Sequence, residues 1–218
     1  MSTNATDAEG HNPTDDTYGT AQSAYEFFNI TLFDSELPDC LITLNRKKGS
    51  RGYFSGNRFT HATGNEQVDE IALNPETLYG RTPEEQFSTL VHEMCHLWQH
   101  HFGDPGRGRY HNKEWADKML AIGLTPSDTG LPGGKMTGQK VTHYISPGGA
   151  FAEKVAYLID KYGYSLDWHD RGRAITEDEK KKKNKQKYTC PECGVNAWAK
   201  PDVSLLCGDC GVALGAEI

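Results

Sequence analysis

The sequence lacks a long apolar run and a recognisable leader. No stretch approaches the roughly 20 apolar residues that a transmembrane helix requires, and the mean hydropathy of the chain is -0.67. The first residues, MSTNATDAEGHNPTDD, contain neither a basic segment nor an apolar one, so we expect no secretory signal. These absences argue against a membrane protein and a secreted protein. We therefore expect a cytoplasmic location, or a nuclear one if the source is a eukaryote.

An excess of positive charge is also absent. The chain has 23 lysines and arginines against 30 aspartates and glutamates, and the acidic excess falls in residues 1–179. An acidic body is not an obvious binder of nucleic acid. Cysteine is sparse before residue 190, where Cys40 and Cys95 stand alone. In a reducing compartment we expect these two thiols to be packed in the interior and not joined in disulfides.

Length and composition divide the chain into parts. With 218 residues and 24.2 kDa, it should contain one mid-sized domain and a small unit. We expect residues 1–16 to be disordered, because they have almost nothing to bury, and residues 17–169 to form an α+β domain. Residues 170–187 are charged and nearly free of apolar side chains, which predicts a linker. A compact cysteine unit follows over residues 188–218.

Local patterns predict the elements of the larger domain. Three short runs bounded by Gly, Asn or Pro predict a small antiparallel or mixed sheet; they are residues 41–45, 52–59 and 68–73. The Gly- and Pro-rich residues 125–149 are expected to form a long loop. Apolar periodicity and end signals predict four helices, over residues 21–36, 83–101, 112–122 and 151–162. Thr82 and Glu85 predict a capping box at the start of the second helix, Trp115 is expected to be buried on the third, and Gly163 is expected to end the fourth.

The helix over residues 83–101 carries the main chemical motif, His92-Glu93-Met94-Cys95-His96. Residues four apart on a helix are separated by about 40° and one turn, so the two imidazoles can bind one zinc ion. Glu93 then lies beside the open coordination position, as a general base requires. The alternative is a chance pattern on a histidine-rich helix. The opposite face argues for the motif, because it is apolar: Phe87, Leu90, Met94, Leu97 and Trp98.

A catalytic zinc ion usually has three protein ligands. His100 continues the stripe but lies about 12 Å from His92 along the helix axis, so one ion cannot bind both. The chain turns at residues 103–106, and His111 is the one histidine before the next predicted helix. We expect His100 and His101 at the surface or at the rim of the cleft. His143, in the predicted loop, is either a group on the substrate side or an exposed loop histidine.

The C-terminal cysteines form two C-x-x-C pairs separated by thirteen residues: Cys190, Cys193, Cys207 and Cys210. Four thiolates close a tetrahedral site, so this pattern predicts a zinc ribbon with a structural zinc ion. About 30 residues cannot fold on an apolar core alone, so metal binding would supply the folding free energy. Two disulfides would need an oxidising compartment, and a redox motif would need a thioredoxin-like context that the sequence lacks.

Basic residues lead into the ribbon and continue within it. With the exposed aromatic Trp198 they are candidate nucleic-acid contacts, because lysines can follow phosphates while an indole stacks on a base. The equal alternative is that Trp198 packs against the ribbon and the lysines form a solvated linker. The basic residues concerned are Lys180, Lys181, Lys182, Lys183, Lys185, Lys187 and Lys200.

These motifs together resemble the SprT-like zinc metallopeptidases, a family that includes proteases of DNA–protein crosslinks. The resemblance spans roughly residues 20–125, and many SprT-like proteins also end in a cysteine ribbon. Usual members have Gly after the third histidine, where this chain has Asn112, a good helix cap. The resemblance to the family rests on residues 92–96, His111-Asn112-Lys113-Glu114-Trp115, Phe28-Asn29, Leu37-Pro38 and Ile71-Ala72-Leu73-Asn74.

The resemblance implies a minimal zincin: a small sheet, an active-site helix and a second helix that carries the third ligand. It implies His92, His96 and His111 as zinc ligands and Glu93 as the base. We therefore expect a zinc metallopeptidase that cleaves protein substrates, DNA-associated or DNA-crosslinked proteins among them, with one catalytic and one structural zinc ion. The alternative is a non-catalytic zinc-binding module for nucleic acid or protein, against which Glu93 argues because a scaffold needs no base.

Overall fold

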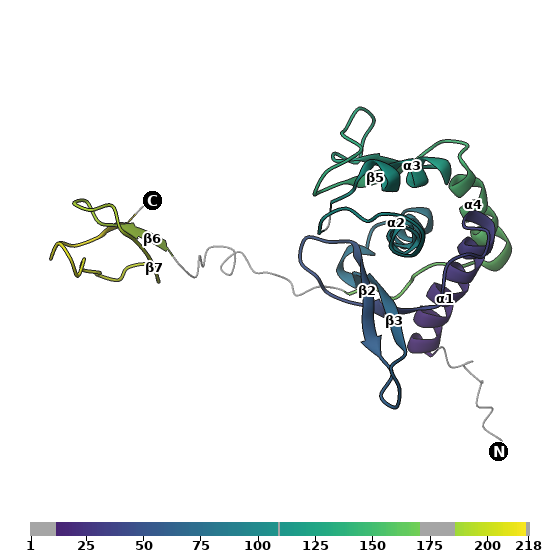
Figure 1. The fold of residues 1–218 in the computed structure, drawn as a ribbon, viewed down its shortest axis with the longest axis horizontal. Coiled ribbons are helices and arrows are strands. Elements are labelled where there is room, and N and C mark those ends of the chain that lie inside the picture. The colour runs from purple at the N-terminus through teal and green to yellow at the C-terminus, as the bar shows by residue number, and fades with distance from the viewer. Residues whose placement is uncertain (1–11, 109, 171–185, 217–218) are drawn as a thin grey trace, which may run out of the picture. The chain divides into compact units, whose positions relative to one another are not determined.

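The computed structural model describes residues 12–108, 110–170 and 186–216 (Figure 1). The chain divides into two compact units, residues 1–171 and 172–218. The first unit combines helices with small sheets, which confirms the α+β class. Among the described residues, no helix has the length and apolar character needed to cross a membrane.

Helix α1 spans Pro13–Leu32 and begins earlier than expected. The prediction of disorder over residues 1–16 is wrong for residues 13–16, and residues 1–11 lie outside the described part of the chain. The side chain of Asn12 caps the helix by accepting a hydrogen bond from the Thr14 N–H, at 3.1 Å. Pro13 and two acidic residues fill the first turn. The capping side chain and the proline at the first helical position therefore start this helix before its apolar face begins.

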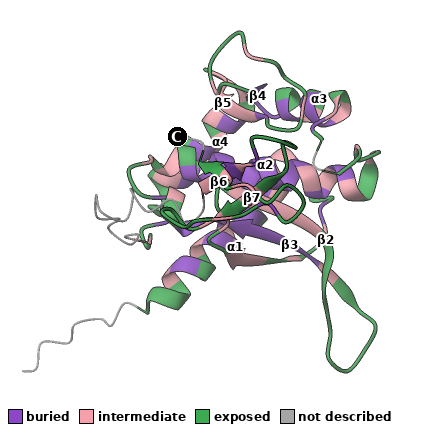
Figure 2. Ribbon diagram, turned by 90° about the vertical axis from the view of Figure 1, so that its left-hand side faces the viewer, coloured by how far each residue is buried: buried purple, intermediate pink, exposed green. Residues whose placement is uncertain are grey.

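A three-stranded mixed sheet follows, as the strand pattern predicted. Strands β1 (Cys40–Leu44), β2 (Gly52–Thr60) and β3 (Gln67–Leu73) take the order β1-β3-β2. β3 pairs in parallel with β1 and antiparallel with β2. The ladder between β2 and β3 is interrupted by a bulge between Ser55 and Phe59. Figure 2 shows β3 as a buried strand and the loop between β2 and β3 as exposed.

Helix α2 spans Pro83–Phe102 and follows the short helix η1 (Pro75–Thr77). Its predicted capping box is present: Thr82 Oγ1 accepts from the Glu85 N–H, and Glu85 Oε2 accepts from the Thr82 N–H. Most of its residues are buried. In Figure 1 the helix is seen nearly end-on between β2 and β3 on one side and α3 on the other.

Helix α3 spans Lys113–Ala121 and begins directly after the Asn112 cap. The predicted long loop over residues 125–149 is wrong at both ends, because β4 (Leu124–Ser127) and β5 (Thr142–Ile145) form an antiparallel hairpin. Thr125 and Ser146 join the strand ends through their hydroxyls, at 2.7 Å. Helix α4 spans Ala150–Tyr162 and ends at the left-handed Gly163, as predicted.

The second unit contains a three-stranded sheet of order β7-β6-β8. Its strands are β6 (Gln186–Thr189), β7 (Asn196–Ala199) and β8 (Gly215–Ala216). The first two residues of β6 lie within residues 170–187, the segment predicted as a linker. Most of that segment lies outside the described residues, together with five of the candidate nucleic-acid contacts: Lys180, Lys181, Lys182, Lys183 and Lys185.

Candidate metal centre

Three histidines from two elements meet beside α2. His92 and His96 lie one turn apart on α2, and His111 directly precedes Asn112, the cap of α3. Each offers a ring nitrogen, and these nitrogens lie within 4.8 Å of one another. The ring centroids of His92 and His96 are 5.2 Å apart, and those of His96 and His111 are 4.9 Å apart. The structure thus brings together the three residues predicted as ligands, in a spacing that fits one metal ion.

A short bridge to the loop before β5 fixes the position of His111. Its backbone exchanges two hydrogen bonds with Gly138, at 2.9 and 3.0 Å. The Gly138 carbonyl also lies 3.1 Å from His111 Nδ1. A carbonyl only accepts, so Nδ1 carries the hydrogen and the lone pair of this imidazole is on Nε2. His111 therefore presents one defined nitrogen to the cluster.

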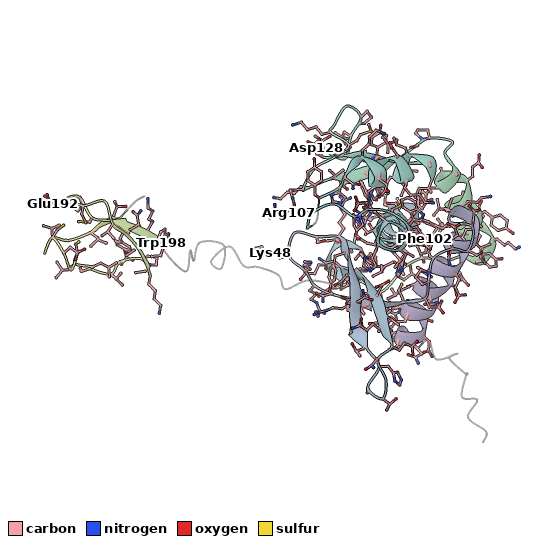
Figure 3. All side chains as sticks on the ribbon, in the orientation of Figure 1. Lys48, Phe102, Arg107, Asp128, Glu192 and Trp198 are labelled. Atoms are coloured by element: carbon pink, nitrogen blue, oxygen red, sulfur yellow. The ribbon has the colours of Figure 1, made fainter. Side chains whose placement is uncertain are left out.

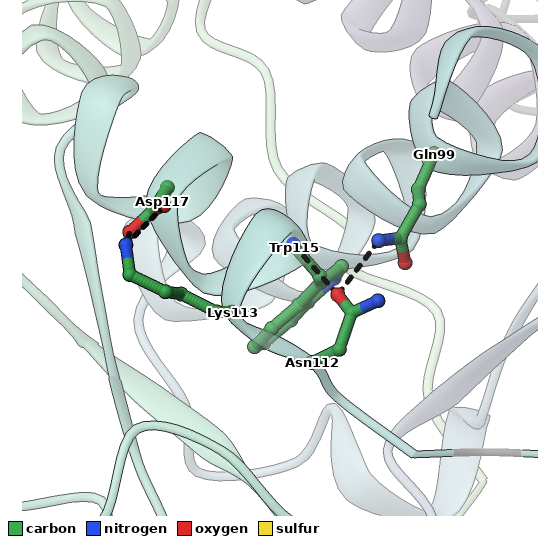
Figure 4. Close-up of polar contacts among 5 residues, drawn as sticks. All are labelled: Gln99, Asn112, Lys113, Trp115 and Asp117. Atoms are coloured by element: carbon green, nitrogen blue, oxygen red, sulfur yellow. Dashed lines mark hydrogen bonds and ion pairs between the residues drawn. The ribbon is translucent and has the colours of Figure 1, made fainter. Parts of the chain in front are cut away.

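The start of α3 is tied to the end of α2 by a polar network (Figure 4). Asn112 Oδ1 caps α3 by accepting from the Trp115 N–H at 3.1 Å, and it also accepts from Gln99 Nε2 at 2.8 Å. The same Gln99 amide donates to Glu114 Oε2 at 2.6 Å. These bonds hold His111 against the helix that carries the other two histidines.

Trp115 forms a common wall for the three imidazoles. Its ring is fully buried, and its centroid lies 4.4 Å from that of His111, 4.9 Å from His92 and 5.1 Å from His96. Apolar periodicity predicted Trp115 as a buried residue, but no local pattern indicates its contact with the histidines. The indole limits how far each imidazole can rotate.

His143 is not an exposed loop histidine; it lies on β5, and its ring contacts a predicted ligand. Its Nδ1 is 3.0 Å from His92 Nδ1, and its Nε2 is 2.9 Å from Ser88 Oγ. Ser88 donates its own hydroxyl hydrogen to the Glu85 carbonyl at 2.8 Å. Ser88 must therefore accept from His143 Nε2–H, and His143 Nδ1 must accept from His92 Nδ1–H. This chain leaves the lone pair of His92 on Nε2, away from His143.

Burial keeps these imidazoles neutral. It lowers the pKa of His92 well below its usual value, with the neighbouring histidines adding to the effect. The pKa of His96 falls to about 3, through burial and the nearby His111. The pKa of His143 also falls to about 3, through burial and the positive charges of Arg81 and Arg51. Neutral imidazole is the form that binds a metal ion.

Glu93 lies beneath the first residues of β2. It is 5% exposed, and burial raises its pKa to about 8, against the opposing effects of Lys47 and a backbone hydrogen bond from Phe54. A methyl group added at Gly52 would lie 3.1 Å from Glu93 Oε1. The carboxyl group is therefore held between α2 and the sheet, with a proton affinity suited to proton transfer near neutral pH.

Cys95 and Cys40 behave as expected for packed cysteines. Cys95 is fully buried, and burial raises its thiol pKa far above the ordinary range. Cys40 is partly buried and packs against the core, and burial raises its pKa to about 12. Neither thiol belongs to a metal cluster among the described residues.

The four ribbon cysteines are brought together in the second unit. Their sulfur atoms lie within 4.8 Å of one another. The two knuckles repeat one hydrogen-bond pattern: Gly194 N–H donates to the Cys190 carbonyl at 3.0 Å, and Gly211 N–H donates to the Cys207 carbonyl at 2.8 Å. Both glycines have left-handed backbones, with φ of 73° and 69°, which a side chain would disfavour. This geometry fits a four-thiolate metal site.

Trp198 lies on β7 (Figure 3) and is 61% exposed. This exposure favours a free indole face over packing against the ribbon. Lys187 is its direct cross-strand partner on β6, and such partners share one face of a sheet. Lys200 follows β7 and is exposed. The structure thus places one lysine and the exposed indole side by side.

The fold and the histidine cluster define an α+β domain whose helix α2 has an H-E-x-x-H motif with histidines placed so that they could hold a metal ion. Residues 21–137, more than half of the chain, match the SprT-like family. The chain therefore belongs to the SprT-like family. It is also 52% identical over 59 residues to an uncharacterized protein in the mucB 3' region of Salmonella typhimurium, a match that covers 27% of this chain and 80% of that protein. No solved structure matches significantly.

Proposed function

We propose that the first unit is a zincin-like zinc metallopeptidase that hydrolyses peptide bonds in protein substrates. The observation that carries the proposal is the placement of Glu93, a buried acid next in sequence to the first of three clustered neutral histidines. Membership of the SprT-like family supports the same chemistry. A purely structural metal site would need the histidines but would gain nothing from a buried acid beside them.

His92, His96 and His111 would hold the zinc ion, which would polarise the scissile carbonyl and lower the pKa of a water molecule. The chain of hydrogen bonds through His143 and Ser88 keeps the Nε2 lone pair of His92 available. Glu93 takes a proton from the attacking water and passes it to the leaving amine. Its pKa, raised by burial, suits a group that must both accept and donate.

The edge of the sheet offers a place for an extended substrate. β2 is one of the two outer strands in the order β1-β3-β2, and the Phe54 N–H that bonds to Glu93 belongs to it. An open strand edge pairs readily with an added peptide strand through main-chain hydrogen bonds. We propose that the substrate pairs with β2, which would bring its backbone beside Glu93.

The direct test replaces Glu93 with Gln, which keeps the shape of the side chain but cannot take up a proton. Peptidase activity on an unfolded protein such as casein should fall by about 10²–10⁴-fold, while the zinc content stays unchanged. Glu153→Gln, at an exposed acid in the first turn of α4, is the matched control and should keep full activity. Wild-type activity in the Glu93→Gln protein would remove Glu93 from the mechanism. A wild-type protein without any peptidase activity would favour the binding-module alternative.

We further propose that the ribbon brings the enzyme to nucleic acid, so that the substrates are DNA-associated or DNA-crosslinked proteins. The exposed Trp198 beside Lys187 supports this, because aromatic stacking contributes about 1–3 kcal/mol per base. Trp198→Ala should weaken binding of single-stranded DNA at least about fivefold in fluorescence anisotropy. Trp168→Ala removes a tryptophan of the first unit that is 48% exposed and should leave binding unchanged. Equal affinities in both variants would exclude Trp198 as a contact.

A further inference from the structure

A second group of ligand-type side chains lies at the far end of α2, apart from the three-histidine cluster. Asp69 of β3 meets His100 and His101 of the last turn of α2, and their ligand atoms lie within 4.8 Å of one another. We infer that Asp69, His100 and His101 form another metal site, suited to zinc or a similar divalent transition-metal ion. The inference does not depend on the proposed peptidase activity.

Asp69 is a buried acid whose carboxylate is held in a fixed orientation. It is 3% exposed, and its Oδ1 accepts a hydrogen bond from the Asn57 N–H at 2.7 Å. Asn57 lies in the β2 bulge, with a left-handed φ of 51°. The other oxygen, Oδ2, points toward α2 and lies 2.6 Å from His101 Nε2. A buried carboxylate needs hydrogen-bond, charged or metal partners, and among the described residues His101 is the side chain that contacts Oδ2.

The β2 bulge also holds His100 close to the Asp69 carboxylate. A methyl group added at Gly56 would lie 2.7 Å from His100 Cε1, so the imidazole packs directly on the glycine backbone. The Phe54 ring lies 5.4 Å away, centroid to centroid. An ion pair between Asp69 and His101 alone would not need a second imidazole in this position. Gly56 and Asn57, two consecutive residues of the bulge, thus position two of the three ligand groups, the His100 imidazole and the Asp69 carboxylate.

The donor set indicates the class of ion. One carboxylate oxygen and two imidazole nitrogens suit zinc, nickel or copper better than magnesium or calcium, which prefer all-oxygen sites. The side chain of His101 is 35% exposed, so the ion would keep an open position on the solvent side. The ion would link the end of α2 to β3, and it would therefore stabilise the folded state by an amount that rises with the logarithm of its free concentration above the Kd.

The test is a zinc titration of the untagged full-length protein in competition with a chromophoric chelator. The wild-type protein should bind one zinc ion more than the three-histidine and four-cysteine clusters account for. His100→Ala and His101→Ala should each weaken that additional site at least about tenfold, as loss of a ligand should cost no less than loss of a group that supports one. His61→Ala, at an exposed histidine outside all three clusters, should change nothing.

Two readouts separate this proposal from the peptidase proposal. His92→Ala should remove the zinc of the three-histidine cluster and leave the additional site intact. Zinc should also raise the Tm of the His92→Ala protein by way of the additional site, and this rise should be lost when His101→Ala is added. If either His100→Ala or His101→Ala binds the additional zinc ion with wild-type affinity, the proposed ligand set is wrong.

Discussion

Replacement of His143 by Ala removes the acceptor for the His92 Nδ1–H and leaves the three predicted ligands in place. In the native structure His92 Nδ1 lies 3.0 Å from His143 Nδ1, and the chain continues to Ser88 and the Glu85 carbonyl. Loss of a group that orients a metal ligand typically reduces metal affinity by about 10–100-fold, which corresponds to roughly 1.4–2.7 kcal/mol. We expect a loss of this size for the three-histidine site.

The assay is a zinc competition titration, with the ribbon site as an internal reference. His143→Asn is the informative comparison, because its Oδ1 can take the position of the lost Nδ1 and accept from His92. It should recover part of the affinity, whereas Ser88→Ala should cause a smaller loss than His143→Ala because it acts one bond further away. The affinity of the ribbon should be equal in every variant. An unchanged affinity at the three-histidine site in His143→Ala would refute the hydrogen-bond chain.

Three further experiments test the surroundings of the three-histidine site. Gly52→Ala would place a methyl group 2.9 Å from the Ala72 carbonyl oxygen and 3.1 Å from Glu93 Oε1. Both β2 and the carboxyl group would have to shift, so peptidase turnover should fall at least about tenfold. Gly19→Ala, with nothing within 4 Å, should instead raise the free energy of unfolding by about 0.5–1 kcal/mol. Asn112→Ala removes the cap of α3 and should cost about 1 kcal/mol in denaturant unfolding, and an unchanged midpoint would contradict the capping role. Cys95 should resist iodoacetamide at pH 8 until the protein is denatured, because burial raises its pKa; mass spectrometry that finds it labelled in the native protein would contradict its burial.

The sequence predicted those parts of the site that depend on local spacing. The capping box at Thr82 located the start of α2, and the four-residue separation of His92 and His96 placed both on one face. His111 was indicated by the turn after α2 and by the resemblance to the SprT-like family. The prediction for His92 and His96 succeeded because helix geometry converts sequence separation directly into position.

The remaining parts depend on contacts between distant segments. β4 and β5 have four residues each, and β4 contains Pro126, so neither gives a clear strand pattern. His143 lies 55 residues from Ser88, and Asp69 lies 32 residues from His101. Partners at such separations are set by tertiary packing, which no local pattern records.

The part of the chain that matches the SprT-like family contains all three clustered histidines and Glu93, but it ends at residue 137. β5, which supplies His143, and α4, whose Phe151 packs 5.6 Å from the Phe28 ring, both lie beyond that point. A fragment of residues 21–137 would therefore keep the motif and expose much of the apolar core. The region that matches the family is smaller than the compact first unit, so any expression fragment of the first unit should extend to the end of α4 or further.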